Sequence, residues 1–312
     1  MSRIKRIFSK DGFWLSLHFI FYRTCLKNLL SDELFTRLQY RAHYGSHLNL
    51  SNPKTYNEKL NWLKLYDHNP LYVTLVDKIL VKDYVRDKIG EQYIIPTLGV
   101  WDSFDKIDFE SLPNQFVLKT NHSGGNTGVV ICKDKSLFDI ASARKKIEQS
   151  MKKDVFSVSR EWPYKHVKRA ILAEEFMEDK KTNELRDYKF FCFDGEPKVL
   201  FVATGRQKLD EPCFDFFDME YNHLDLKCNH PQADITPEKP EKFEEMKELA
   251  RKLSAGLKHV RIDLYEINGK VYFGEITLYH FQAQMKFYPN SWNYKWGEWL
   301  ILPKKNEKDY NN

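Results

Sequence analysis

Acidic and basic residues near the end of the chain have a spacing that suits metal chemistry. Arg261 and Asp263 alternate along one run of β-branched and aromatic residues, and Glu275 and Thr277 alternate along the next. Side chains two positions apart on a strand share a face, so each pair lies on one face of its strand. Two carboxylates with a neighbouring hydroxyl on one rigid sheet face would form a Mg²⁺ site.

The turn between these runs decides whether the two pairs meet. Asn268-Gly269 is the strongest short-range signal for a hairpin. A two-residue turn would set Asp263 opposite Gly274 and send Glu275 to the other face. A three-residue loop with Gly269 in the left-handed conformation and a bulge brings the pairs together. We predict the bulge, because it creates a metal site; the alternative is an ordinary hairpin with solvated acids.

A second group of residues is suited to phosphate. Ser123, Gly124 and Gly125 occupy a small-residue loop between two strand-like runs. Glycine permits close approach and positive φ, so the backbone N–H groups of such a loop can contact phosphate oxygens. Lys119, on the strand entering the loop, can add a fixed positive charge. Because the glycines lie between strands, the loop is neither a Walker nor a dinucleotide-binding motif; a plain surface hairpin is the alternative.

The elements that must position these groups are helices followed by a mixture of strands and helices. Residues 1–70 are expected to be helical, with capping-box spacing from Thr55 to Glu58, and a further helix is expected from Tyr72 to Ile89. Strands or extended segments are expected at 94–101, 116–120, 129–132, 170–177, 188–193 and 198–203. A basic helix is expected at 137–152, and a helix with an apolar stripe at 243–257. This order predicts an α+β fold with antiparallel sheets.

Composition narrows the function classes. The 312 residues are enough for a large core, and the 42% hydrophobic and 30% charged fractions are ordinary for a globular protein. A net charge of +5 is too mild to indicate nucleic acid, and zinc-finger spacing is absent from the sequence. The five cysteines lack metal or redox spacing, which favours a reducing cytoplasm.

The apolar run at residues 13–22 is too short to span a bilayer. Two interpretations stay open: a helix packed on the body, which we favour, and a peripheral membrane contact.

Taken together, the motifs resemble the ATP-grasp superfamily over about residues 77–278. More narrowly, the chain resembles its TupA-like branch through NPKTYNEKLNWLKLY, VDK, FVLKTNHSGG, DYKFFCFDG and VRIDLYEINGKVYFGEIT. That branch is associated with teichuronopeptide and capsular-polysaccharide synthesis. The resemblance implies an ATP-grasp fold, in which two α+β subdomains with antiparallel sheets clamp ATP, preceded here by a helical N-terminal region.

The resemblance also implies roles for particular residues in nucleotide binding. The phosphates would be contacted by Lys78 and Lys119 and covered by Ser123, Gly124 and Gly125. Glu174 would read the adenine amino group, beside the hinge backbone of Phe176 and Met177, and Asp187 would contact the ribose.

By the same resemblance, Asp263, Glu275 and Thr277 would bind Mg²⁺, and Arg261 would steady the transferring phosphate. Lys189 and Arg206 would hold the γ-phosphate or an anionic acceptor. The third metal ligand of the superfamily is usually asparagine, so Thr277 implies a weaker or hydrated second ion. The branch's usual continuation with proline and glycine is replaced by residues 278–284, which puts the acceptor pocket in doubt.

The expected division of the chain follows from this fold. A helical N-terminal region covers residues 1–70, a small α/β segment 71–115, and a lid subdomain with the glycine-rich hairpin 116–186. The metal and substrate subdomain covers residues 187–303, and residues 304–312 form a polar tail.

The function expected from the resemblance is an ATP-dependent carboxylate–amine ligase that forms an amide through an acyl phosphate. Its partners would be ATP, a uronic-acid-containing saccharide or its activated or lipid-linked precursor, and a small amine such as an amino acid or amino alcohol. We expect it in the cytoplasm, at the inner face of the membrane if the N-terminus makes a membrane contact. Two alternatives are a glycosyltransferase of capsule synthesis, for which Asp215 and Asp218 would be candidates, and a non-catalytic nucleotide-binding protein.

Overall fold

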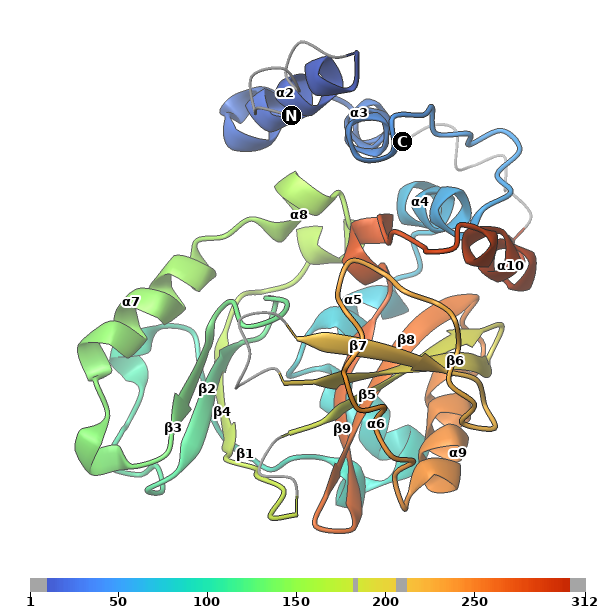
Figure 1. Cartoon of the computed structure of the whole chain (residues 1–312). Coiled ribbons are helices and arrows are strands. Elements are labelled where there is room, and N and C mark those ends of the chain that lie inside the picture. Colours follow the sequence, from blue (N-terminus) through green and yellow to red (C-terminus); the bar gives the residue numbers. More distant parts are fainter. Residues whose placement is uncertain (1–9, 182–184, 206–211, 304–312) are drawn as a thin grey trace. The chain divides into compact units, whose positions relative to one another are not determined.

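The computed structural model describes residues 10–181, 185–205 and 212–303, which fall into two compact units. The helical unit contains the described residues of 1–69, 154–165 and 279–312, and the sheet unit contains those of 70–153 and 166–278 (Figure 1). Each unit is therefore built from segments that are far apart in the sequence. The five-part division expected from the sequence stays a prediction.

The helical unit contains helices packed around aromatic rings. Its elements are α2 (Lys10–Arg23), η1 (Cys25–Leu29), α3 (Asp32–Tyr44), α4 (Tyr56–Tyr66), α8 (Val155–Ser159), η5 (Trp162–Lys165), η6 (His280–Ala283) and α10 (Ser291–Trp299). The predicted capping box at the start of α4 is confirmed, because Thr55 and Glu58 each accept a hydrogen bond from the other's backbone N–H. None of the described helices has the length and hydrophobicity needed to cross a membrane.

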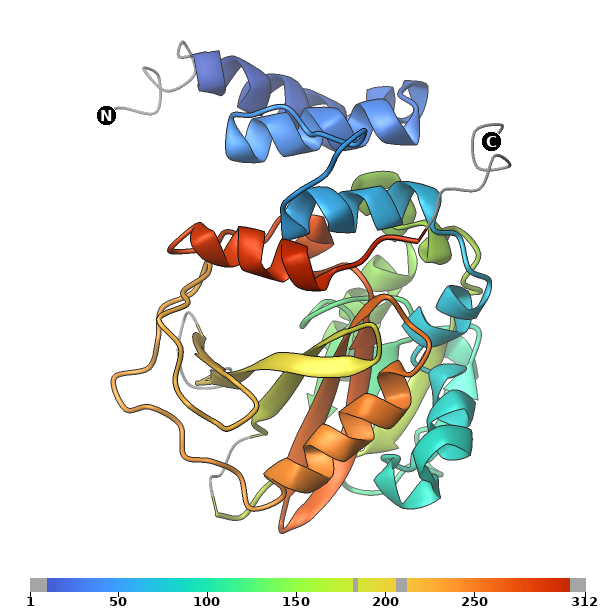
Figure 2. The same ribbon diagram turned by 90° about the vertical axis from the view of Figure 1, so that its right-hand side faces the viewer.

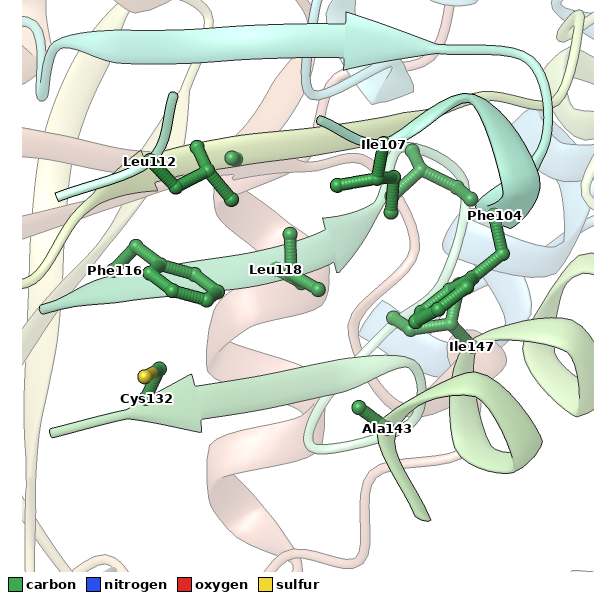
Figure 3. Packing of buried hydrophobic residues seen from close by; sticks show 10 residues of the cluster. Phe104, Ile107, Leu112, Phe116, Leu118, Cys132, Ala143 and Ile147 are labelled. Carbon is green, nitrogen blue, oxygen red and sulfur yellow. The ribbon is translucent and has the colours of Figure 1, made fainter. Parts of the chain in front are cut away.

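The sheet unit contains a small antiparallel sheet with strand order β1-β4-β2-β3. Its strands are β1 (Thr97–Trp101), β2 (Phe116–Thr120), β3 (Val129–Cys132) and β4 (Ile171–Glu175), and α7 (Ile140–Met151) packs against β2 and β3. Phe116 and Leu118 of β2 are buried against Ala143 and Ile147 of α7 (Figure 3). Since side chains alternate along a strand, Lys119 lies on the opposite face of this sheet.

A larger antiparallel sheet in the same unit has the order β7-β6-β5-β8-β9. Its strands are β5 (Asp187–Phe193), β6 (Glu196–Thr204), β7 (Cys213–Phe217), β8 (His259–Ile267) and β9 (Lys270–Thr277). The helix α9 (Phe243–Ser254) covers one face with its buried apolar stripe, as predicted, and Phe243 stacks on Phe190 of β5 (Figure 2). Lys189, the neighbour of Phe190, therefore lies on the other face.

The sheet unit also contains shorter elements, before β1 and within the small-sheet segment. They are α5 (Leu71–Val76), α6 (Val81–Ile89), η2 (Glu91–Tyr93), η3 (Phe104–Lys106) and η4 (Lys135–Leu137). The predicted α+β fold with antiparallel sheets is confirmed, and the glycine loop does connect two paired strands, β2 and β3.

Candidate active site

The late hairpin is formed by β8 and β9, and its turn differs from the predicted one. Ile267 pairs with Lys270, so the turn consists of Asn268 and Gly269, with φ values of 51° and 75°. Positive φ at both central residues is typical of the type I′ turn, whose twist fits a hairpin. The predicted three-residue loop with a bulge at Gly269 is therefore wrong.

The bulge that aligns the acidic residues lies within β9. Leu264 pairs with Phe273 and Asp263 pairs with Glu275, which leaves Gly274 as the extra residue. A Cβ at Gly274 would lie 2.9 Å from a ring carbon of Tyr265 and 3.0 Å from the backbone oxygen of Asp263, so both neighbours would have to shift to admit a side chain. The predicted alignment is confirmed although its cause differs, since Asp263 and Glu275 stand opposite each other.

Arg261 connects the two carboxylates. Its Nε donates to Asp263 Oδ1 at 2.6 Å, and its Nη2 donates to Asp263 Oδ2 at 2.7 Å and to Glu275 Oε1 at 3.0 Å. Thr277 Oγ1 lies 3.5 Å from the same Glu275 oxygen. The two strands thus bring Arg261, Asp263, Glu275 and Thr277 together on one face of the large sheet.

The strand β5 adds a buried cation to this group. Lys189 contacts the Asp263 carboxylate and donates to Asp187 Oδ1 at 3.0 Å. Burial lowers the pKa of Lys189, against the opposing effect of the Asp263 charge. Because Asp187 and Asp263 are both buried, the lysine offsets two charges that are removed from water. Arg206, the other predicted cation, lies outside the described residues.

The predicted single helix from Tyr72 to Ile89 is wrong, and its break positions Lys78. The helix stops at Val76 and restarts at Val81. Between them, the Asp77 carboxylate accepts hydrogen bonds from the N–H groups of Ile79 and Leu80, at 2.8 and 3.3 Å, and so holds the turn that precedes α6.

The break also lets Lys78 reach two other segments of the sheet unit. Its Nζ donates to Ser123 O at 2.7 Å and lies 3.6 Å from Glu275 Oε2. Its backbone N–H donates to Asn121 O at 3.0 Å. One ammonium group therefore touches both the glycine loop and the late hairpin, which are more than a hundred residues apart in the printed sequence.

The glycine loop is held at its base and open at its tip. Ser123 is buried, and its Oγ donates to Thr127 O at 2.6 Å. His122 is also buried, with Nε2 3.2 Å from Ser150 O, and burial lowers the pKa of its ring. A Cβ added at Gly124 or Gly125 would meet nothing within 4 Å. The loop is thus anchored by side chains while its glycines face open space.

Glu174 forms a second centre of charge, on the small sheet. This buried residue of β4 contacts Lys119 of β2 through Oε2 and Lys82 of α6 through Oε1, the latter at 2.6 Å. Burial alone would raise the pKa of Glu174, but the two lysines outweigh it and hold the pKa below its usual value. The chain continues from β4 into the half-buried residues Phe176 and Met177.

A hollow of about 790 Å³ lies on the other face of the large sheet. Tyr188 of β5 and Glu266 of β8 line it, together with residues 235–241. These two side chains alternate with Asp187, Lys189 and Asp263, so the hollow is separate from the group of charges described above.

The family to which the chain belongs follows from a match with a family model. The model for TupA-like ATPgrasp matches residues 58–301, which is most of the chain. The chain belongs to the TupA-like ATP-grasp family. This membership confirms the predicted fold and supports an ATP-dependent ligase. No curated protein matches the chain significantly.

Solved structures with some likeness to the chain include ligases of small molecules. A D-alanine–D-alanine ligase from Bacillus anthracis is 13% identical, with a TM-score of 0.37, over 66% of this chain and 57% of that one. The corresponding ligase from Helicobacter pylori is 16% identical, with a TM-score of 0.39, over 78% and 69%. An N5-carboxyaminoimidazole synthetase from Staphylococcus aureus, complexed with ADP, is 14% identical, with a TM-score of 0.40, over 74% and 53%. The family assignment rests on the family model and not on these distant likenesses.

In this member of the TupA-like ATP-grasp family, three residues that the sequence did not single out position the predicted ones. Lys82 holds Glu174, Asp77 breaks the helix before Lys78, and Gly274 provides the bulge beside Glu275. Asp77 could have been found as a turn-forming aspartate whose side chain bonds the backbone two residues on, and Gly274 as a glycine inside a strand pattern.

The ATP-grasp family implies Mg²⁺, and the residues of the late hairpin fit it. Protein sites for Mg²⁺ often use one or two carboxylates, with waters and substrate phosphates as the remaining ligands. Asp263 and Glu275, opposite each other in the strand register, provide such a pair. Within the described ranges, no cluster of three or more His, Cys, Asp or Glu side chains could hold a metal by itself.

Proposed function

We propose that the protein is a carboxylate–amine ligase that consumes ATP and forms an amide through an acyl phosphate. The observation that carries the proposal is the position of Lys78, whose ammonium touches both the loop at Ser123 and the carboxylate of Glu275. A triphosphate lying beside this ammonium would have the loop glycines on one side and the Asp263–Glu275 pair on the other. In this proposal, the carboxylate substrate attacks the γ-phosphate and releases ADP, and an amine then displaces phosphate.

The proposed metal ligands are Asp263, Glu275 and Thr277. Bound Mg²⁺ would offset charge on the phosphates and orient them for in-line attack. The chain's own residues have a related task, since Arg261 already lies between the two carboxylates and can donate to a transferring phosphoryl oxygen. Lys189 contacts both Asp263 and Asp187 and offsets part of their negative charge.

The nucleotide would lie with its base toward the small sheet. Glu174 is ionised and can accept a hydrogen bond from an amino group of the base, and the backbone at Phe176 and Met177 follows directly in the chain. Lys119 and Lys78, with Ser123, Gly124 and Gly125, would contact the phosphates. Asp187, at the start of β5, is proposed to contact the ribose hydroxyl groups.

The substrates are proposed from the family. We infer that the carboxylate belongs to a hexuronic acid of a capsular or surface polysaccharide or its precursor, and that the amine is an amino acid or amino alcohol. We place the protein in the cytoplasm. The exposed apolar side chains of α2 and η1, among them Phe19, Ile20 and Leu29, support a peripheral contact with the inner face of the membrane.

One incubation tests the proposal. The protein is mixed with Mg·ATP, uronic-acid saccharides and a panel of amines, and nucleotides and saccharides are followed by mass spectrometry. ADP together with a mass gain on the saccharide is the expected result. AMP would indicate adenylation instead, and products from a sugar nucleotide without ATP turnover would indicate a glycosyltransferase.

Replacement of Glu275 by Gln removes a carboxylate from the proposed metal site. We expect turnover to fall by about 10²-fold or more, the cost of losing one charge-stabilising contact, while the circular dichroism spectrum stays unchanged. Glu220→Gln, an exposed acid elsewhere in the sheet unit, is the control and should leave turnover intact. Full activity in E275Q would remove Glu275 from the site.

The glycosyltransferase alternative gains no support from its candidate acids. Asp215 is fully buried, and it accepts hydrogen bonds from the backbone N–H of Ala233 and contacts His223 Nε2 at 3.0 Å. Asp218 accepts from the backbone N–H groups of Glu220 and Asn222 within a turn. Both acids therefore have structural partners.

A further inference from the structure

Lys82 is a half-buried lysine that the proposed mechanism does not use. Its side chain is 12% exposed, and its Nζ contacts Ile95 O at 2.9 Å, Thr97 Oγ1 at 2.6 Å and Glu174 Oε1 at 2.6 Å. An ammonium group has three hydrogen-bond donors, and these contacts use all of them. Lys82, on α6, is therefore fixed in place by Thr97 of β1, by Ile95 two residues before it, and by Glu174 of β4.

Lys119, the other cation on Glu174, has a different setting. Its side chain is 24% exposed, twice the value for Lys82, and it extends from β2 next to the glycine loop. Under the proposed function Lys119 contacts the nucleotide phosphates, so it must share or leave Glu174 when nucleotide binds. Glu174 is buried, and a buried carboxylate that loses its counter-charge tends to take up a proton.

We propose that Lys82 is a positioning residue that keeps Glu174 ionised and aimed at the base when Lys119 turns to the phosphates. It thereby makes the site selective for a purine with an amino group at C6, as in adenine, over guanine, which has a carbonyl oxygen at C6. This inference rests on the proposed function.

The selectivity follows from hydrogen-bond chemistry. An ionised carboxylate only accepts hydrogen bonds, so it can pair with the amino group of adenine and is mismatched to the guanine carbonyl oxygen. A protonated Glu174 would carry a donor as well and would accommodate either base. The charged groups that face Glu174 are Lys119 from β2 and Lys82 from α6, and Thr97 lies opposite it on β1. Without Lys82, the ionisation of Glu174 would depend on pH.

The test compares wild type with Lys82→Met. Dissociation constants for ATP and GTP are measured by calorimetry between pH 6 and pH 8. At each pH the dissociation constant of the variant is divided by that of the wild type, so that the titration of the phosphates themselves cancels from this ratio. Loss of the Lys82 charge should raise the pKa of Glu174, so the ratio for ATP should increase from pH 8 to pH 6, by up to about tenfold. The preference for ATP over GTP should fall as well.

Three further variants isolate the cause. Lys82→Arg keeps the charge and should restore a flat ratio, and Lys88→Met, which removes an exposed lysine of the same helix, should behave as wild type. In a Glu174→Gln background, K82M should have no further pH-dependent effect, because the two residues act as one unit. If K82M does not fold, Lys82→Gln retains donors without charge and takes its place.

The outcomes separate this inference from the proposed function. A ratio that stays flat in K82M, with the preference for ATP over GTP unchanged, overturns the role of Lys82 while wild-type ATP binding still supports the function. A purely structural role would weaken ATP and GTP equally at every pH, which also overturns it. Failure of the wild type to bind ATP at all would overturn the inference and the proposed function together.

Discussion

Substitution of Gly274 by Ala should uncouple the two carboxylates without unfolding the hairpin. The new Cβ would lie 2.9 Å from a ring carbon of Tyr265 and 3.0 Å from the backbone oxygen of Asp263. Tyr265 is half-buried and can move, but the oxygen belongs to a strand paired on both sides, with β5 and β9. The bulge must therefore shift, at a cost of about 1–3 kcal/mol, the range for overpacking.

The functional effect should exceed the loss of stability. Relief of the clash shifts Asp263 relative to Glu275 by less than the roughly 1 Å misplacement that can cost about 10²-fold in a positioned site, so we expect part of that cost. The assay is ATP binding by calorimetry with Mg²⁺ and with EDTA. Wild type should bind Mg·ATP more tightly than free ATP, and this gain should fall by about tenfold or more in G274A.

Gly269→Ala provides the matched control in the same hairpin. Gly269 has φ of 75° and no atom within 4 Å of an added Cβ, so alanine there costs about 1–2 kcal/mol of backbone strain without touching the bulge. Urea denaturation should show similar destabilisation in both variants, whereas only G274A should lose the gain from Mg²⁺. Equal Mg²⁺ dependence in the two variants would refute the assignment of the bulge as the aligning device.

Two further predictions concern stability. Burial lowers the pKa of His259 to about 3, so the folded state binds fewer protons than the unfolded state below pH 6.5; stability is complete above that pH and should fall by about 2 kcal/mol between pH 7 and pH 5. Urea denaturation at a series of pH values should show this slope in wild type and a shallower one in His259→Leu; identical slopes would contradict it. Asp77→Ala removes the acceptor of the Ile79 and Leu80 N–H groups in the turn before α6 and leaves Asn121 Nδ2 without its 2.8 Å acceptor, so we expect a loss of about 2 kcal/mol and weaker ATP binding. An unchanged urea midpoint would show that the helix break does not depend on Asp77.

The parts of the fold that could be predicted are those encoded by neighbouring residues. Alternating β-branched and aromatic residues with Asn-Gly or Asp-Gly between them define the β8–β9 and β5–β6 hairpins, and the stripe of α9 defines its buried face. The acidic and basic site residues lie on these same elements, so their types and faces could be read as well.

The rest depends on contacts between distant segments. The apolar spacing of residues 72–89 continues across the break at Asp77, because both short helices bury residues at helical intervals; the pairing of Asp77 with Asn121 lies outside any local pattern. The bulge at Gly274 is likewise set by the register between β8 and β9 and not by the turn. The sequence therefore predicted correctly that Asp263 and Glu275 lie opposite each other, but it placed the bulge at Gly269 and not at Gly274.

The charges in the sheet unit have a consequence for how the proposed site is tested. Glu174, Asp263 and Glu275 are each paired with cations that the proposed function assigns to phosphate binding. Replacing Lys119 alone would leave buried Glu174 with Lys82 as its one remaining cation, and replacing Arg261 alone would leave buried Asp263 with Lys189. Either change removes part of the charge that balances a buried carboxylate, and so destabilises the site whether or not a phosphate ever binds. Lost activity in a single lysine or arginine variant is therefore weak evidence for a phosphate contact. The informative comparison removes a cation together with its partner, as in the double variant Lys119→Met with Glu174→Gln, which preserves the net charge of the empty site. The affinity of this double variant for ATP is compared with that of Glu174→Gln alone. Any further loss of affinity reports what Lys119 contributes to the bound nucleotide.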